Sequence, residues 1–311
     1  MEYLEDFGSA MNAGRRIALF LVSWGWGSLG ASEPQSRLSD DDLRIEGILA
    51  LALPGTEPAR SLRLIVHPRL GDLVRGDHLR TMLGVRHGFT ERWEVIADID
   101  WFFAHGLQAQ PLFARKGLSS VHVGTKYLIG RLARGPWDCS IGADFIRPVG
   151  HPPREITDGR RHFSPYLTFS RELTQQPGWR VFWGAGYDFT AATSIPGEKR
   201  RNEFPGDSTT VSAGLVRVRG PLAYTWEAAC RRESAGPGEG FVVTLRPGLV
   251  WHLPSRLTFG SSGRWLVGAA LQLSHGPEGT DARVSVKLRG NFDFLRVLGL
   301  GKSRRDGPAP K

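Results

Sequence analysis

Ionisable side chains recur at every second position in several runs of this sequence, with apolar residues between them. Over residues 93–104 the acidic members are Glu94, Asp98 and Asp100. Successive side chains of a β-strand point to opposite faces, so such a run gathers its charges on one face. A surface that carries both signs of charge can form a structural ion-pair network, or can line a polar passage whose field selects solutes.

The same alternation assigns sixteen charged residues to one face of a predicted sheet. Acids and bases are evenly matched among them, and the two interpretations above stay open for each. The set is Arg80, Arg86, Glu94, Asp98, Asp100, Lys126, Asp138, Asp144, Arg180, Asp188, Glu227, Arg231, Arg246, Lys287, Arg289 and Asp293.

The sequence contains none of the common motifs for catalysis or metal binding. It has no phosphate loop, no paired-cysteine zinc motif and no G-x-S-x-G nucleophile elbow. The histidines have spacings that fit no metal site. His105, His162 and Ser164 could approach one rim of a barrel, but their spacing defines no triad. We therefore expect no catalytic residue, no metal and no cofactor.

The segments that carry these charges alternate apolar and polar residues, and we predict them to be β-strands. Approximate spans are 61–68, 78–89, 93–104, 119–132, 137–147, 160–172, 178–190, 207–219, 221–233, 239–252, 256–275 and 281–294. The first and the eighth alternate least cleanly, and the eighth fits either register. No apolar stretch reaches the roughly 20 residues of a spanning helix.

Short and long connections alternate between these runs. Short ones fall at 90–92, 133–136, 174–177, 220–221 and 254–255, and longer ones at 105–118, 148–159, 190–206, 234–238 and 276–280. Tight turns on one side and longer loops on the other are typical of membrane barrels. The pattern predicts an all-β protein, a transmembrane antiparallel up-and-down β-barrel of about 12 strands. If all the short connections lie on one side of the membrane, residues 256–275 must form one long strand.

Aromatic residues favour the barrel over a soluble β-sandwich, which also alternates. They flank the short turns, as an aromatic girdle at a membrane interface does; they are Phe89, Trp93, Trp137, Trp179, Trp251 and Phe259. Cys139 and Cys230 fall in register with apolar neighbours, so we expect both to point at lipid.

Four segments divide the chain. Residues 1–32 are a leader with a signal peptide, whose start we place at Met11 because an acidic stretch precedes it. Residues 33–60 are an N-terminal periplasmic or plug segment, and a short helix over 43–53 is the open alternative. Residues 61–294 form the barrel, and 295–311 form a C-terminal tail.

Two motifs resemble the phenol-degradation meta-pathway outer-membrane protein family. His87–Val95 is similar to its strand-turn-strand with glycine, threonine and arginine, and Gly117–Tyr127 to its glycine-rich strand ending in lysine-tyrosine. Ser119 and Ser120 replace the family's glycine-aspartate. The resemblance implies an outer-membrane barrel that takes up hydrophobic or aromatic compounds.

Together these patterns predict an outer-membrane channel or uptake protein for small solutes, and not an enzyme. The alternatives are a barrel enzyme that modifies lipid or lipopolysaccharide, and a structural barrel without transport. The net charge of +9 is spread along the chain without a nucleic-acid motif, so no nucleic-acid partner is expected. The expected partners are outer-membrane lipid and lipopolysaccharide, an unidentified small solute and the outer-membrane assembly machinery.

Overall fold

The computed structural model describes residues 52–69, 79–103, 116–131, 135–149, 159–192, 206–233, 240–254, 264–277 and 279–291. The predicted leader, residues 33–51 and the C-terminal tail lie outside these residues. Within the described ranges, no helix is long and apolar enough to cross a membrane.

Twelve strands make up the fold. They are β1 (Leu62–Arg69), β2 (Leu79–Thr90), β3 (Trp93–Phe103), β4 (Lys116–Arg131), β5 (Asp138–Pro148), β6 (Arg160–Glu172), β7 (Trp179–Ala192), β8 (Ser208–Arg219), β9 (Leu222–Glu233), β10 (Gly240–His252), β11 (Arg264–Gly276) and β12 (Gly279–Asn291).

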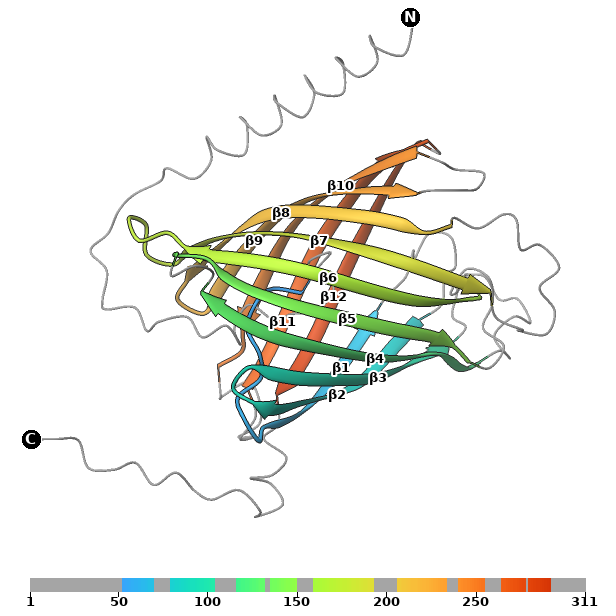
Figure 1. The fold of residues 1–311 in the computed structure, drawn as a ribbon, viewed down its shortest axis with the longest axis horizontal. Coiled ribbons are helices and arrows are strands. Elements are labelled where there is room, and N and C mark those ends of the chain that lie inside the picture. Colours follow the sequence, from blue (N-terminus) through green and yellow to red (C-terminus); the bar gives the residue numbers. More distant parts are fainter. Residues whose placement is uncertain are drawn as a thin grey trace, which may run out of the picture. The chain divides into compact units, whose positions relative to one another are not determined.

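Each strand pairs with the next along the chain, and every pair is antiparallel. Figure 1 shows the strands following one another around the barrel, and the end strands β1 and β12 contact each other. The prediction of an all-β, twelve-stranded, up-and-down antiparallel barrel is confirmed. We call the end that holds the β2–β3, β4–β5, β6–β7 and β8–β9 connections the short-turn end, and the opposite one the long-loop end.

The two faces of the sheet differ as the alternation predicts. Large apolar side chains are exposed on the outer face, among them Leu83, Ile141 and Phe241. In β8, Val211 is exposed and Val216 is buried, which fixes the register that the sequence left open. Large apolar side chains are exposed on every strand except β9, and such a surface needs lipid rather than water against it, as in outer-membrane barrels.

Two local features differ from the expectations, and a third prediction stays untested. The predicted longer connection at 276–280 is a tight hairpin in which Gly276 pairs with Gly279, because Gly279 adopts a φ of 106° that other residues rarely reach. The described part of β11 begins at Arg264, and the predicted strand residues 256–263 lie outside the described chain. Cys139 was expected to point at lipid, but it is only 2% exposed and is therefore buried. Its β6 partner is the much larger Phe169, beside which a thiol is shielded.

Candidate functional site

A buried ion pair lies on the inner face near the short-turn end. Glu94 on β3 and Lys126 on β4 are register partners, and Lys126 Nζ lies 3.0 Å from Glu94 Oε1. The Glu94 side chain is fully buried and that of Lys126 is 2% exposed. Two charges removed from water are costly unless further hydrogen bonds satisfy them. The partners that do so come from outside the sheet.

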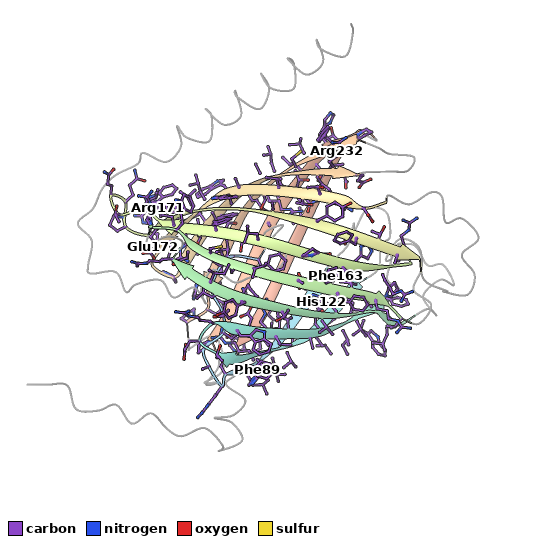
Figure 2. All side chains as sticks on the ribbon, viewed as in Figure 1. Phe89, His122, Phe163, Arg171, Glu172 and Arg232 are labelled. Atoms are coloured by element: carbon purple, nitrogen blue, oxygen red, sulfur yellow. The ribbon has the colours of Figure 1, made fainter. Side chains whose placement is uncertain are left out.

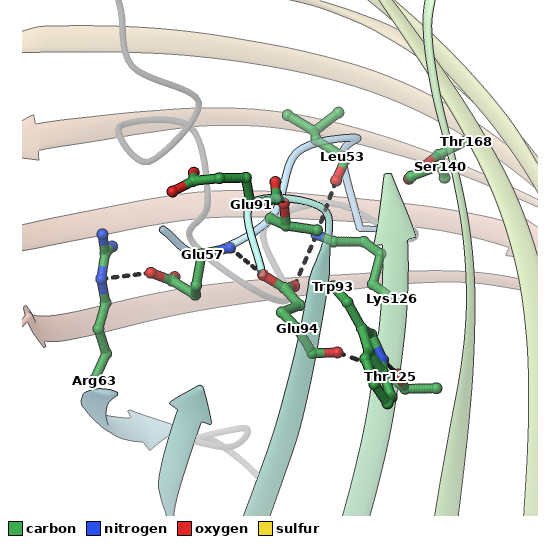
Figure 3. A network of polar contacts seen from close by, with 11 residues as sticks. Leu53, Glu57, Arg63, Glu91, Trp93, Glu94, Thr125, Lys126, Ser140 and Thr168 are labelled. Carbon is green, nitrogen blue, oxygen red and sulfur yellow. Dashed lines mark hydrogen bonds and ion pairs between the residues drawn. The ribbon is translucent and has the colours of Figure 1, made fainter. Parts of the chain in front are cut away.

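Residues 52–61, which precede β1, supply those partners; we call them the strap. The Glu57 amide donates to Glu94 Oε2 at 2.7 Å, and Lys126 Nζ donates to the Leu53 carbonyl at 3.1 Å. The Glu57 side chain is itself paired, with Arg63 Nε 2.6 Å from its Oε2. Figure 3 shows this cluster of Glu57, Arg63, Glu94 and Lys126, which we call the clamp.

The strap backbone also lies close against the β2–β3 turn. Thr56 Oγ1 donates to the Glu91 carbonyl at 2.7 Å, and the Arg60 amide donates to the Gly88 carbonyl at 2.7 Å. Gly88 is needed for this approach, because a Cβ there would lie 2.2 Å from the Pro58 carbonyl oxygen. The glycine of the sequence motif at 87–95 therefore makes room for the strap.

The other contact of the strap is with the opposite wall. Leu53 belongs to a buried apolar cluster whose remaining members come from strands β7 to β11: Phe182, Val216, Ala223, Val250, Leu266 and Ala270. The strap thus joins the β2–β4 wall to the β7–β11 wall across the interior. The cluster was not predicted, because the alternation assigns only charged and polar residues to the inner face. The only sequence signal for it was isolated apolar residues, such as Val216, at positions that the alternation assigns to the polar face.

A second group of ionisable residues lies farther from the short turns. His122 on β4 sits between two carboxylates, with Nδ1 2.8 Å from Asp98 Oδ2 and Nε2 3.0 Å from Asp144 Oδ1. Asp144 is the register partner of Ser164 on β6. The three strands β3, β4 and β5 therefore present one continuous polar strip to the interior.

The strip continues onto β6 and β7. His162 Nδ1 lies 2.8 Å from Asp188 Oδ2, and Ser164 Oγ donates to Asp188 Oδ1 at 2.8 Å. We call Asp98, His122, Asp144, His162, Ser164 and Asp188 the acid–histidine row. The Ser164 hydroxyl is bonded to the carboxylate and not to the imidazole, so these residues do not form the Ser–His relay of a hydrolase. His105 lies outside the described residues.

Three other predicted charged residues each contact a residue of a neighbouring strand along the inner wall. Arg180 Nη2 lies 3.2 Å from Glu172 Oε1, and Arg246 Nη1 lies 3.3 Å from Glu227 Oε2. Arg231 Nε donates to Ser208 Oγ at 3.0 Å. These pairs link neighbouring strands, as a structural network does.

The remaining members of the predicted set are placed as follows. Arg86 is buried, and Asp100 and Asp138 are half-buried. The side chains of Arg80, Lys287 and Arg289 lie outside the described part of the chain, as does all of Asp293. Among the described residues, no group of three or more His, Cys, Asp or Glu is arranged to hold a metal ion.

No protein-family model matches this chain, and no curated protein matches it. The resemblance to the phenol-degradation meta-pathway family is therefore not confirmed.

Solved structures do match. The COG4313 outer membrane channel from Pseudomonas putida F1 is 9% identical, with a TM-score of 0.52 over 78% of this chain and 98% of that one. A KdgM porin is 9% identical, with a TM-score of 0.44 over 74% of this chain and 96% of that one. At such identity the likeness concerns the fold alone, and that fold is an outer-membrane-type β-barrel.

Proposed function

We propose that the protein is an outer-membrane channel through which small polar solutes diffuse. The observation that carries the proposal is the acid–histidine row, a strip of partly exposed ionisable groups on the inner face of a barrel whose outer face is apolar. His122 and Asp144 in this strip keep 19% and 28% of their side-chain surface exposed. Exposed charges along a passage attract and orient polar solutes.

The strap is the constriction of this channel. It is hydrogen-bonded to one wall through Glu94 and Lys126, and its Leu53 packs among residues of the opposite wall. In outer-membrane barrels the short turns face the periplasm. The passage is therefore wider toward the cell exterior and narrowed by the strap at the periplasmic end.

The solutes are polar rather than hydrophobic. The family resemblance implies hydrophobic or aromatic compounds, but the acid–histidine row on the inner face of β3 to β7 carries carboxylates, imidazoles and a hydroxyl. Bringing an apolar compound along such a wall would strip water from these groups without replacing their hydrogen bonds. A solute with its own donors and acceptors does replace them.

Conductance across planar lipid bilayers tests the proposal. The purified barrel is compared with a Leu53→Asp variant, in which a carboxylate cannot remain in the apolar cluster and the strap is released. The variant should conduct more than the unchanged protein. Heat-modifiable migration on a gel must show that both are folded. Folded protein that conducts in neither form would refute the channel and favour a structural barrel.

A further inference from the structure

The two ends of the strap are held in different ways. Thr56 and Arg60 donate hydrogen bonds to carbonyls of the β2–β3 hairpin. The Glu57 amide donates to the buried carboxylate of Glu94. Leu53, by contrast, reaches the β7–β11 wall with an apolar side chain, which Figure 3 shows pointing away from Glu94. Polar contacts therefore fix one end of the strap, and apolar packing holds the other against the opposite wall.

A glycine separates these two ends. Gly55 lies between Leu53 and Thr56 and has a positive φ of 113°, which glycine adopts far more readily than other residues. Rotation of the backbone at Gly55 can move Leu53 while Thr56 stays in place. Such a movement breaks the hydrogen bond from Lys126 Nζ to the Leu53 carbonyl, whereas the ion pair of Lys126 with Glu94 stays intact. The strap thus has a hinge between its fixed end and its docked end.

Three buried hydroxyls without a hydrogen-bond partner lie where Leu53 docks. They belong to Ser170, Ser212 and Thr225, which are between 1% and 3% exposed. Ser170 is the register partner of Phe182, and Thr225 is the partner of Val216, and both partners belong to the apolar cluster around Leu53. Ser212 lies on the inner face of β8, four positions before Val216. The docked strap therefore closes over a wall that carries unsatisfied polar groups.

These hydroxyls lie on the short-turn side of the acid–histidine row. Figure 2 shows Arg171 and Glu172, which directly follow Ser170 on β6, at the short-turn end, with His122 farther along the barrel. A buried hydroxyl without a partner keeps the cost of losing its water. Water that enters when Leu53 leaves the wall removes this cost. The closed arrangement is therefore opposed by groups built into the wall that it covers.

We propose that the Leu53 end of the strap is a hinged gate, which swings about Gly55 away from the β7–β11 wall while residues 56–61 stay attached to β2 and β3. The inference rests on the proposed function, because it makes the constriction of that channel movable. Apolar packing of Leu53 favours the closed state, and hydration of the three hydroxyls favours the open one. Hinges of this kind turn on a few residues that absorb the change in φ and ψ.

Thiol labelling measures the opening without relying on conductance. In the full-length chain with Cys139→Ala and Cys230→Ala, Ser212→Cys places a thiol on the wall that the docked strap covers. A small charged methanethiosulfonate should label it at a rate set by how often the gate opens. Mass spectrometry counts the label on protein whose heat-modifiable migration shows that it is folded.

Two further positions serve as references for the labelling. Thr210→Cys, at a half-buried position on the same face of β8, should react rapidly and show that the reagent enters the barrel. Ile96→Cys, at a position that is 3% exposed and two residues after Glu94, lies on the wall that keeps the strap. It should stay protected while Ser212→Cys reacts, because the fixed end of the strap does not leave.

Three substitutions test what sets the balance. Thr225→Val replaces a partnerless hydroxyl by a methyl group of the same shape, and should slow the labelling of Ser212→Cys by about fivefold or more. Leu53→Ala removes most of the docked side chain and should speed the labelling by at least about tenfold. Thr244→Val is the matched control, since this hydroxyl is hydrogen-bonded to Ser274, and it should leave the rate unchanged.

Each other outcome contradicts a defined part of the proposal. Lasting protection of Ser212→Cys would overturn the gate. Equal rates for Ser212→Cys and Ile96→Cys would overturn the hinge, because the strap would then leave both walls together. An unchanged or faster rate in Thr225→Val would overturn the contribution of the hydroxyls.

The channel and the gate fail separately. Conductance is recorded on the same folded preparations. Labelling of Ser212→Cys in a barrel that does not conduct would refute the channel alone. Conductance in a barrel whose Ser212→Cys stays protected would refute the gate alone and leave the strap as a fixed constriction.

Discussion

The clamp and the acid–histidine row are built from the same kinds of residue on the same inner face, yet they differ in burial. In the clamp, the side chains of Glu57 and Glu94 are fully buried, whereas in the row His162 and Asp188 keep 18% and 21% of their surface exposed. The strap makes the difference, because it covers one group and not the other. Charges under the strap hold structure together, and beyond it the charges other than Asp98, whose side chain is 5% exposed, remain accessible to solutes.

This contrast changes what each group contributes to stability. A buried charge that loses its partner keeps its full desolvation cost, whereas an exposed one regains water. Substitutions in the clamp should therefore act on folding, and substitutions in the row on the passage of ions. The following experiments separate the two effects.

Lys126→Met should cause the largest loss. It removes the ammonium that lies 3.0 Å from Glu94 and leaves a buried carboxylate without its counter-charge, which costs about 3–5 kcal/mol in such sites. Urea unfolding in detergent micelles, followed by tryptophan fluorescence, measures the change. Adding Glu94→Gln to the same chain should recover most of it. A loss below about 1 kcal/mol in the single variant would show that the clamp is not buried as described.

Gly88→Val should displace the strap at a cost of about 1–3 kcal/mol, because the added side chain would overlap the Pro58 carbonyl. Channel conductance should rise in the same variant. Gly117→Ala is the control, since the nearest atom to its added Cβ, on Phe102, is 3.8 Å away. An unchanged conductance in a folded Gly88→Val protein would contradict the strap as the constriction.

His122→Gln should alter ion selectivity more than stability. The imidazole separates Asp98 from Asp144, and its removal leaves two carboxylates facing the passage, so the reversal potential in a salt gradient should shift toward cations. The loss of stability should stay near 1–2 kcal/mol. His275→Gln, whose exposed ring contacts Thr280 outside the row, is the control and should leave the reversal potential unchanged. A shift of equal size in both variants would argue against the row.

Trp93→Phe should have the smallest effect, since it lies outside both groups. It removes a hydrogen bond of 2.8 Å from the indole Nε1 to Thr125 Oγ1 on the exposed outer face, worth about 0.5–1.5 kcal/mol. Thr125 Oγ1 also donates to the Glu94 carbonyl, so the double variant with Thr125→Val should cost little more than Thr125→Val alone, as unfolding in urea would show. Fully additive losses would mean that the two side chains do not interact.

Much of the fold could be predicted because period-two alternation is a local property of the chain. The spans of the sixth and eighth runs, 160–172 and 207–219, agree with β6 and β8 to within one residue. The 276–280 connection was misjudged, since its length alone did not reveal the left-handed backbone of Gly279. The register of β8 stayed open because both of its faces carry small or β-branched residues.

The candidate site was less predictable than the fold. Alternation placed Glu94, Asp98, Lys126 and Asp144 in one set, but it could not divide that set into a clamp and a row. The division depends on the strap, most of whose residues carry no strand or helix pattern; its hydrogen-bond partners in the sheet lie 26 to 73 places away along the chain. Leu53 and Lys126 show this best, since their contact joins positions 73 residues apart.

The sequence by itself determined the twelve-stranded antiparallel order and the apolar character of the outer face, because both follow from local alternation and from the lengths of turns. Only the tertiary structure decided which inner charges are buried and which remain accessible. These properties depend on register between strands and on a segment crossing the interior. Neither is encoded in any single stretch of the chain.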